Sequence, residues 1–255
     1  ARLWPDLGGE PPTERPGDIA GEVRLVDFDP AGEDKLLAAI CFSHSNLSDE
    51  EMLRRVRKLA DTQRAELLCA YVGERKNRRH RPGRAFERID YRFEIVVDYG
   101  AFRDLQRHRM LTVEWQRLTP ELGYTVPDLI TESGVERDYV ECLERSRSLY
   151  DAMAADFDLE ASYAVSLAHR VRCVMQMNAR EALHLIELRS GTQGHPSYRR
   201  IAAQMYRAIA EVAGHKAIAA AMVHVEGRWA DLERLESERR AEARRAQRTG
   251  IPEAR

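Results

Sequence analysis

The chain has 255 residues and a formal net charge of −2, with 44% hydrophobic and 32% charged residues. This composition is typical of a folded protein that is long enough to bury a core, and it excludes a disordered chain. The near-neutral charge argues against nucleic-acid binding over the whole surface, although local basic patches remain open. No apolar run has the length of a membrane span and no signal peptide is visible, so we expect a cytoplasmic protein that does not bind membranes.

The four cysteines, Cys41, Cys69, Cys142 and Cys173, are far apart and form no CxxC pair. This spacing indicates a reducing compartment with buried free thiols, and neither a disulfide framework nor a zinc site. We expect no metal site.

The sequence divides into three parts. Residues 1–21 contain a Pro/Gly-rich stretch that reads as a linker or N-terminal extension, which suggests a fragment of something longer. Residues 22–225 carry the patterned elements of one domain. Residues 226–255 are very charged and predict a helical or partly disordered tail.

The first half of the domain predicts two strands and several helices. Alternating residues predict strands, Ser48 with Glu51 forms a capping box, and one helix from this box reaches about Cys69. The other elements expected are a strand over 22–28, a helix over 33–42, a basic loop over 74–84, a strand over 86–97 and a helix over 101–111.

The second half is mainly helical. A long amphipathic helix over 136–157 is expected to bury Tyr139, Cys142, Leu143, Leu149, Tyr150 and Met153. Asn178 with Glu181 repeats the capping box and starts a helix that runs to Arg189. The other elements expected are short helices over 159–165 and 216–225, a strand over 171–177 and a helix over 197–212. Without regular βαβ alternation, this order predicts an α+β fold, with a small, largely antiparallel sheet packed with several long helices.

The tripeptide Arg107-His108-Arg109 is the most informative feature. On the helix expected there, neighbouring side chains point about 100° apart, so the three would suit a large planar or multiply charged ligand, or a subunit interface. The alternative is a set of surface ion pairs with Asp104, Glu114 and other carboxylates. The sequence has no Walker, Rossmann, HExxH or GxSxG motif.

The basic loop, Glu74 to Arg84, has two interpretations. It is either a solvated, mobile loop or a loop that contacts phosphate, because arginine suits phosphate oxygens.

The order of these motifs resembles the flavin-dependent thymidylate synthases over roughly Val23 to His215. The matching residues are Phe86-Glu87 before the strand, Arg107-His108-Arg109, Asn178-Ala179-Arg180 and Leu188-Arg189. This resemblance implies a homotetramer with FAD between subunits, which NADPH reduces. It also implies methylation of dUMP to dTMP with methylenetetrahydrofolate as the one-carbon donor.

The resemblance also implies roles for single residues. Arg107, His108, Arg109, Asn178 and Arg180 would bind FAD. Arg107 and Arg189 would bind dUMP, with Arg189 as the catalytic arginine that holds and polarises the uracil.

Several positions depart from the family pattern. Glu114-Trp115 replace Asn-Glu, Arg117 replaces Ser and Thr119 replaces Arg after the tripeptide, while Asp104 replaces a dUMP-contacting Gln. Pro82, Arg84 and Arg88 occupy two histidine positions and a threonine position, and the segment Gly194 to Tyr198 lacks the usual Gln and Glu. Each lost charge-assisted hydrogen bond costs about 1.5–3 kcal/mol, so we expect a degraded dUMP site and a better preserved FAD site.

Three functions follow as hypotheses. The chain is an active flavin-dependent thymidylate synthase, or a non-catalytic copy of the fold that still binds flavin and contributes to an oligomer, or a nucleic-acid-binding or regulatory module that uses the basic loop. The second includes a protein with two copies of the fold, which would form a dimer in place of the tetramer. The third is the weakest, because interleaved aromatic residues and a positive net charge are absent.

Overall fold

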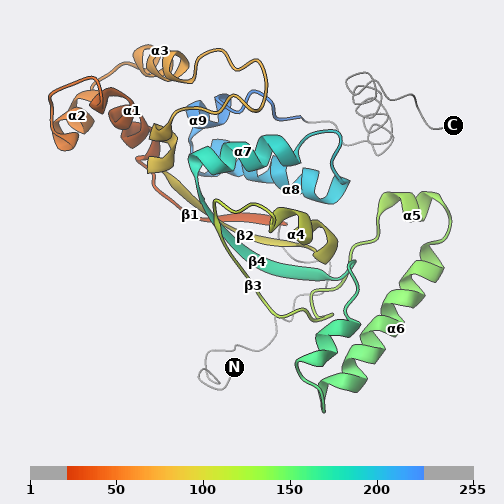
Figure 1. Ribbon diagram of the computed structural model, residues 1–255. Coiled ribbons are helices and arrows are strands. Elements are labelled where there is room, and N and C mark those ends of the chain that lie inside the picture. The colour runs from red at the N-terminus through yellow and green to blue at the C-terminus, as the bar shows by residue number, and fades with distance from the viewer. Residues whose placement is uncertain (1–21, 227–255) are drawn as a thin grey trace, which may run out of the picture.

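The computed structural model describes residues 22–226, which form a four-stranded sheet covered on one face by helices (Figure 1). The strands are β1 (Val23–Phe28), β2 (Asp90–Asp98), β3 (Thr112–Trp115) and β4 (Arg170–Asn178). Their order in the sheet is β1-β2-β4-β3, and every neighbouring pair is antiparallel. The predicted α+β fold with a small antiparallel sheet is therefore confirmed.

The two central strands alternate between a buried and an open face. On β2 the side chains of Tyr91, Phe93 and Ile95 are buried, and on β4 those of Val171, Cys173 and Met175 are buried. The residues between them are polar or partly exposed, which is the pattern of an antiparallel sheet with one face on a core.

The buried face packs against α4 (Tyr99–Leu105) and against helices from the C-terminal half. The latter are α7 (Ala179–Arg189) and α8 (Pro196–Arg207), followed by a π-helical turn over Ala208–Val212 and by α9 (Lys216–Ala220). Figure 1 shows α7 and α8 side by side above the strands.

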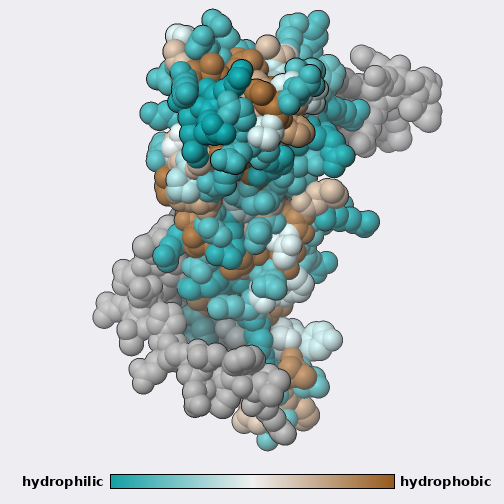
Figure 2. Space-filling view, turned by 90° about the vertical axis from the view of Figure 1, so that its left-hand side faces the viewer, coloured by the Kyte–Doolittle hydropathy of each residue, from teal (hydrophilic) through white to brown (hydrophobic). Residues whose placement is uncertain are grey.

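The N-terminal helices form one end of the molecule. They are α1 (Gly32–Phe42), α2 (Asp49–Val56) and α3 (Asp61–Val72). The expected single helix from Ser48 to Cys69 is wrong, because the chain leaves the helix after Val56 and a new one starts after Ala60, whose backbone N–H donates to the Gln63 side chain. The cap at Ser48 is confirmed, since its Oγ accepts the Glu51 N–H at 3.2 Å. The surface at the left of Figure 1 is mainly hydrophilic, with apolar residues in small groups (Figure 2).

An arm extends from the opposite end. It consists of α5 (Asp128–Glu132), α6 (Glu136–Ala154) and a 3₁₀ turn over Glu160–Ala164, which pack mainly on one another. The expected buried side of α6 is only partly correct. Leu143 is buried but Cys142 and Leu149 are exposed, because the arm projects away from the sheet (Figure 1).

Other boundaries also differ from the expectations. The segment Arg84–Arg88 forms a 3₁₀ turn, so β2 begins at Asp90 instead of Phe86. Strand β3 was not expected. The cysteines are free, but only Cys173 is buried, whereas Cys69 and Cys142 are exposed and Cys41 is half-buried. The prediction of buried thiols is therefore wrong for Cys69 and Cys142, because they lie on sides of α3 and α6 that face solvent.

Within residues 22–226, no helix is both long and apolar enough to cross a membrane. The expected linker over 1–21 and nearly all of the charged tail after residue 225 lie outside the described residues.

A buried histidine makes Gly32 obligatory at the start of α1. His215 is 2% exposed, and its Nδ1 is bonded to the Tyr91 hydroxyl at 2.7 Å. A Cβ on residue 32 would lie 2.6 Å from His215 Cε1. Because the ring is enclosed and bonded, we expect Gly32→Ala to lower the free energy of unfolding by about 1–3 kcal/mol.

Urea unfolding would measure this loss. Gly191→Ala is the matched control, because its nearest new neighbour would be the Leu188 carbonyl oxygen at an ordinary 3.6 Å. Equal stability of the two variants would contradict the packing of His215 against Gly32.

Candidate functional site

The tripeptide Arg107-His108-Arg109 lies in the turn after α4 and not on a helix. Asp98 caps the start of α4, since its Oδ1 accepts the Ala101 N–H at 2.7 Å, and the helix ends at Leu105. The chain then turns through a bond from the His108 N–H to the Leu105 carbonyl and runs into β3. The expected helix over 101–111 is therefore wrong in its second half, because β3 must pair with β4. Arg107 and Arg109 are exposed, and His108 is buried.

Helix α7 brings the second group of predicted residues to the same place. The Asn178 side chain accepts the Glu181 N–H at 2.9 Å, so the predicted cap is confirmed. The Glu181 carboxylate does not complete a capping box, because its Oε1 lies 3.0 Å from His108 Nδ1. Glu181, His184 and Leu188 are spaced at one helical face, and all three line a cleft with the tripeptide.

His108 connects α7 to the turn after α4 through both ring nitrogens. Arg189 Nε donates to His108 Nε2 at 3.1 Å, so this nitrogen must be the acceptor. The ring hydrogen then sits on Nδ1 and is donated to Glu181. These two contacts hold the His108 ring in one orientation, between Glu181 and Arg189.

Arg189 is largely satisfied by the protein itself. Its Nη2 donates to the Asp104 carbonyl oxygen at 2.6 Å, its Nη1 lies 3.7 Å from Asp104 Oδ1, and its guanidinium lies 5.3 Å from the centre of the Tyr198 ring. Its side chain is 13% exposed. Asp104 also lies 3.5 Å from Arg107. The aspartate at the expected glutamine position therefore engages both arginines expected to bind dUMP.

Two clefts meet at Leu188 and Arg189. One, of about 470 Å³, is lined by the tripeptide, Met110, Arg81 and the α7 residues. The other, of about 830 Å³, lies between residues 76–79 and the loop that joins α7 to α8. Sites for small molecules are typically about 300–1,000 Å³.

The charge of the clefts favours an anion. Burial lowers the pKa of His184; the Glu181 carboxylate opposes this effect, and the guanidinium groups of Arg81 and Arg78 add to it. His108, Glu181 and His184 could supply three metal ligands, since their ligand atoms lie within 4.8 Å of one another. However, both nitrogens of His108 are already engaged and Arg189 donates to one of them, so His108 has no nitrogen free for a metal ion.

Asn178 and Arg180 lie apart from the cleft walls. Asn178 caps α7, and Arg180 donates to the Pro82 carbonyl at 2.9 Å and to Glu87 Oε1 at 3.1 Å. Arg180 therefore connects α7 to the segment that precedes β2. Direct contact of these two residues with a flavin stays a prediction.

A buried ion pair was missed by the sequence reasoning. Arg75 and Glu187 make a two-pronged contact, with both N–O distances 2.6 Å and side chains 1% and 0% exposed. The available signal was the helical spacing of α7, which places Glu187 beside Leu183 and Ile186 on a buried face. A glutamate at such a position predicts a buried cationic partner.

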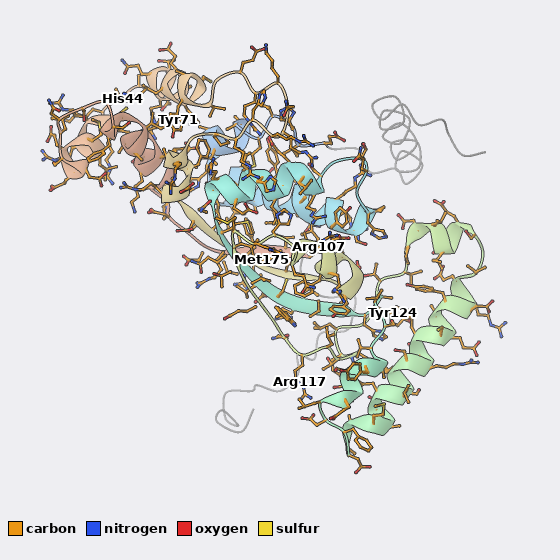
Figure 3. The ribbon with its side chains drawn as sticks, in the orientation of Figure 1. His44, Tyr71, Arg107, Arg117, Tyr124 and Met175 are labelled. Atoms are coloured by element: carbon orange, nitrogen blue, oxygen red, sulfur yellow. The ribbon has the colours of Figure 1, made fainter. Side chains whose placement is uncertain are left out.

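The residues that depart from the family pattern after the tripeptide lie on β3 and just beyond it. Glu114 and Trp115 are exposed on β3. Arg117 pairs with Asp158 of the arm, with 2.9 Å between Nη1 and Oδ1. Figure 3 shows Arg117 near the arm and Arg107 beside α4, well apart. Within residues 22–226, Arg117 thus has a partner outside the two clefts.

The fold and these motifs define the class of protein. Residues 24–214 match the family model described as thymidylate synthase complementing protein. The chain therefore belongs to that family, and its domain is like a flavin-dependent thymidylate synthase.

Curated relatives are longer than this chain. A UPF0159 protein of Chlamydia muridarum (strain MoPn / Nigg) is 38% identical over 230 residues, which cover 90% of this chain and 43% of the relative. A UPF0159 protein of Thermoplasma acidophilum is 33% identical over 221 residues, which cover 85% and 44%. The chain thus spans less than half of the length of these relatives.

Solved structures share the fold. The flavin-dependent thymidylate synthase ThyX of Helicobacter pylori, complexed with FAD and dUMP, matches with a TM-score of 0.56 and 20% identity, covering 74% of this chain and 93% of that one. The UMP/dUMP methylase PolB of Streptomyces cacaoi, bound with 5-Br dUMP, matches with a TM-score of 0.56 and 17% identity, covering 78% and 94%.

Proposed function

We propose that this domain binds FAD in the two clefts that meet at Arg189 and that, on its own, it methylates dUMP poorly. The observation that carries the proposal is the set of contacts that the Arg189 side chain makes within the protein. Its guanidinium contacts the Asp104 backbone, the Asp104 carboxylate and His108, so it has few donors left for a uracil.

The residues present fit a flavin dinucleotide. The clefts offer exposed cations for phosphate, including Arg107 and Arg109, and apolar surface from Met110, Leu188 and Tyr198 for a ring system. We propose that Arg107, His108 and Arg109 contact FAD directly. When bound, FAD would supply the reducing equivalents that NADPH provides in the family reaction.

Asn178 and Arg180 would support the same site by holding α7 in place. Asn178 fixes the start of α7, and Arg180 fixes the segment at Pro82 and Glu87 against that helix. Loss of either would shift the helix that carries Glu181 and Arg189.

The dUMP site is proposed to be weak. Arg107 and Arg189 remain as the substrate-binding residues, and Arg189 as the catalytic arginine, but the Asp104 carboxylate lies 3.5 Å from Arg107 and 3.7 Å from Arg189. A phosphate dianion or a uracil carbonyl would have to displace this carboxylate. NADPH and methylenetetrahydrofolate would be used only by an assembly that overcomes this competition.

A second role is a non-catalytic copy of the fold in an oligomer. Relatives more than twice as long as the matched segment favour it, since they have room for a second copy. We propose either a tetramer of single-copy chains or a dimer of two-copy chains, in which another copy supplies groups that this one lacks.

Flavin absorbance and dUMP calorimetry test the proposal. We expect added FAD to give a protein-bound flavin spectrum, and dUMP or UMP to bind FAD-loaded protein only at millimolar concentrations. His108→Ala should weaken FAD binding, whereas His44→Ala, an exposed histidine far from the clefts, should not. No flavin binding would refute the cofactor proposal, and micromolar dUMP binding would refute the weak nucleotide site.

A further inference from the structure

The loop between α3 and the 3₁₀ turn over Arg84–Arg88 has a defined shape. This arginine loop, residues 76–81, carries Lys76, Arg78, Arg79 and Arg81. Asn77 organises it, since its Oδ1 accepts the Arg79 N–H at 2.9 Å and its carbonyl accepts the His80 N–H at 3.0 Å. The loop is therefore folded on itself around a single asparagine.

Both ends of the arginine loop are fixed to the cleft. Before it, Arg75 is neutralised by Glu187 of α7 and also donates to the carbonyls of His80 at 2.6 Å and Ala221 at 2.8 Å. After it, the Pro82 carbonyl accepts from Arg180 of α7. The two anchors hold the loop along the helix that carries Arg189.

Three guanidinium groups on this loop have no partner in the part of the chain that the structure describes. Within residues 22–226, Arg78, Arg79 and Arg81 make no side-chain hydrogen bond or ion pair, whereas nearby Arg84 pairs with Glu87 at 3.0 Å. Arg78 and Arg81 both contribute to the lowered pKa of His184, so their charges reach the wall of the smaller cleft. Like charges held together without partners favour an anionic ligand.

The balance of charge in the joined clefts is strongly positive. Their walls contain seven Lys and Arg side chains and three carboxylates, an excess of four positive charges, in a protein whose formal net charge is −2. Two of the three carboxylates, Glu181 and Glu187, are already bonded to His108 and Arg75. Asp104, which does not line the clefts, lies beside Arg107 and Arg189 and offsets part of this excess, so the uncompensated cations are mainly those of the arginine loop and Arg109.

We propose that the arginine loop is an anion-binding site that takes the diphosphate of a nucleotide lying across Arg189. Several forked donors suit the many oxygens of a diphosphate better than a single carboxylate. A small phosphorylated molecule fits better than a nucleic acid, because these cations line concave clefts in a protein whose formal net charge is −2. The existence of the anion site stands on the loop alone, and the identity of its ligand as FAD rests on the proposed function.

Calorimetry with inorganic diphosphate tests the site without any flavin. Wild-type protein should bind it at low salt. The triple variant Arg78→Ala, Arg79→Ala, Arg81→Ala should bind it with an affinity at least about tenfold lower, since the loss of one charge-assisted hydrogen bond is enough for such a factor. The matched control is Arg24→Ala, Lys58→Ala, Arg137→Ala, which removes the same charge from exposed positions outside the clefts. An equal loss in both variants, or no loss in the loop variant, would overturn the anion site.

A pair of flavins identifies the ligand. Riboflavin has no phosphate, so the loop variant should bind FAD about tenfold more weakly and riboflavin as well as wild type does. Unchanged FAD affinity in a variant that has lost diphosphate would overturn the assignment to FAD. Failure of wild type to bind either flavin would count against the proposed function while the diphosphate result still decides the anion site.

Discussion

Replacing Glu187 with glutamine is expected to lower the free energy of unfolding by about 3–5 kcal/mol, because it leaves the buried charge of Arg75 without a counterion. The Arg75 side chain is 1% exposed and cannot turn to solvent without opening the contacts to His80 and Ala221. A domain of this size loses about 2–4 °C of melting temperature per kcal/mol, so we expect a decrease of roughly 10 °C in a thermal unfolding experiment.

The exposed pair on α6 supplies the control. Arg145 lies 2.5 Å from Glu141 with both side chains more than half exposed, and such pairs contribute about 0.5 kcal/mol or less. Glu141→Gln should therefore leave the melting temperature almost unchanged. Combining Glu187→Leu with Arg75→Met removes both charges and should recover part of the stability lost by Glu187→Gln. If Glu187→Gln were as mild as Glu141→Gln, the pair could not be the anchor of the arginine loop.

Replacing Asp104 with glutamine is expected to strengthen dUMP binding about tenfold or more. The change removes the carboxylate that lies 3.5 Å from Arg107 and 3.7 Å from Arg189, and frees both guanidinium groups for charge-assisted bonds. The 2.6 Å bond from Arg189 to the residue 104 carbonyl would remain, so the arginine should keep its place. Calorimetry with FAD-loaded protein measures the change.

A second aspartate controls for charge. Asp158→Asn removes the same negative charge from the arm, where it pairs with Arg117 outside the clefts, and should leave dUMP binding unchanged. Similar gains in both variants would mean that overall charge, and not the release of Arg107 and Arg189, governs nucleotide binding. No gain with Asp104→Gln would show that other missing groups limit the site.

Local patterns in the sequence predicted most of the sheet. Alternation along β1, β2 and β4 and the cap at Asn178 act over a few residues, so they are visible without tertiary contacts. Strand β3 has four residues and, within residues 22–226, pairs only with β4, so its alternation is too short to recognise. Its pairing with β4 also ends α4 at Leu105, and the residues around His108 contain no helix-ending pattern that would predict this.

The sequence predicted which residues form the site, but it did not predict the contacts between them. The family resemblance grouped His108 with Arg189, but their bond joins residues 81 positions apart. The contacts of Arg189 with Asp104 and of Arg75 with Glu187 span 85 and 112 positions. Such contacts depend on how α4, α7 and the arginine loop come together, which composition and periodicity do not contain.

The arm has a consequence for how this domain can be rebuilt. The chain enters it and leaves it at adjacent points, since the Thr125 N–H donates to the Ala168 carbonyl and Tyr124 forms a bridge with His169. Because α6 packs mainly within the arm, residues 126–167 form a module that a short turn could replace while the sheet keeps its register. Deletion, exchange or grafting of this module is therefore open to protein engineering and to evolution without redesign of the core beneath α7 and α8.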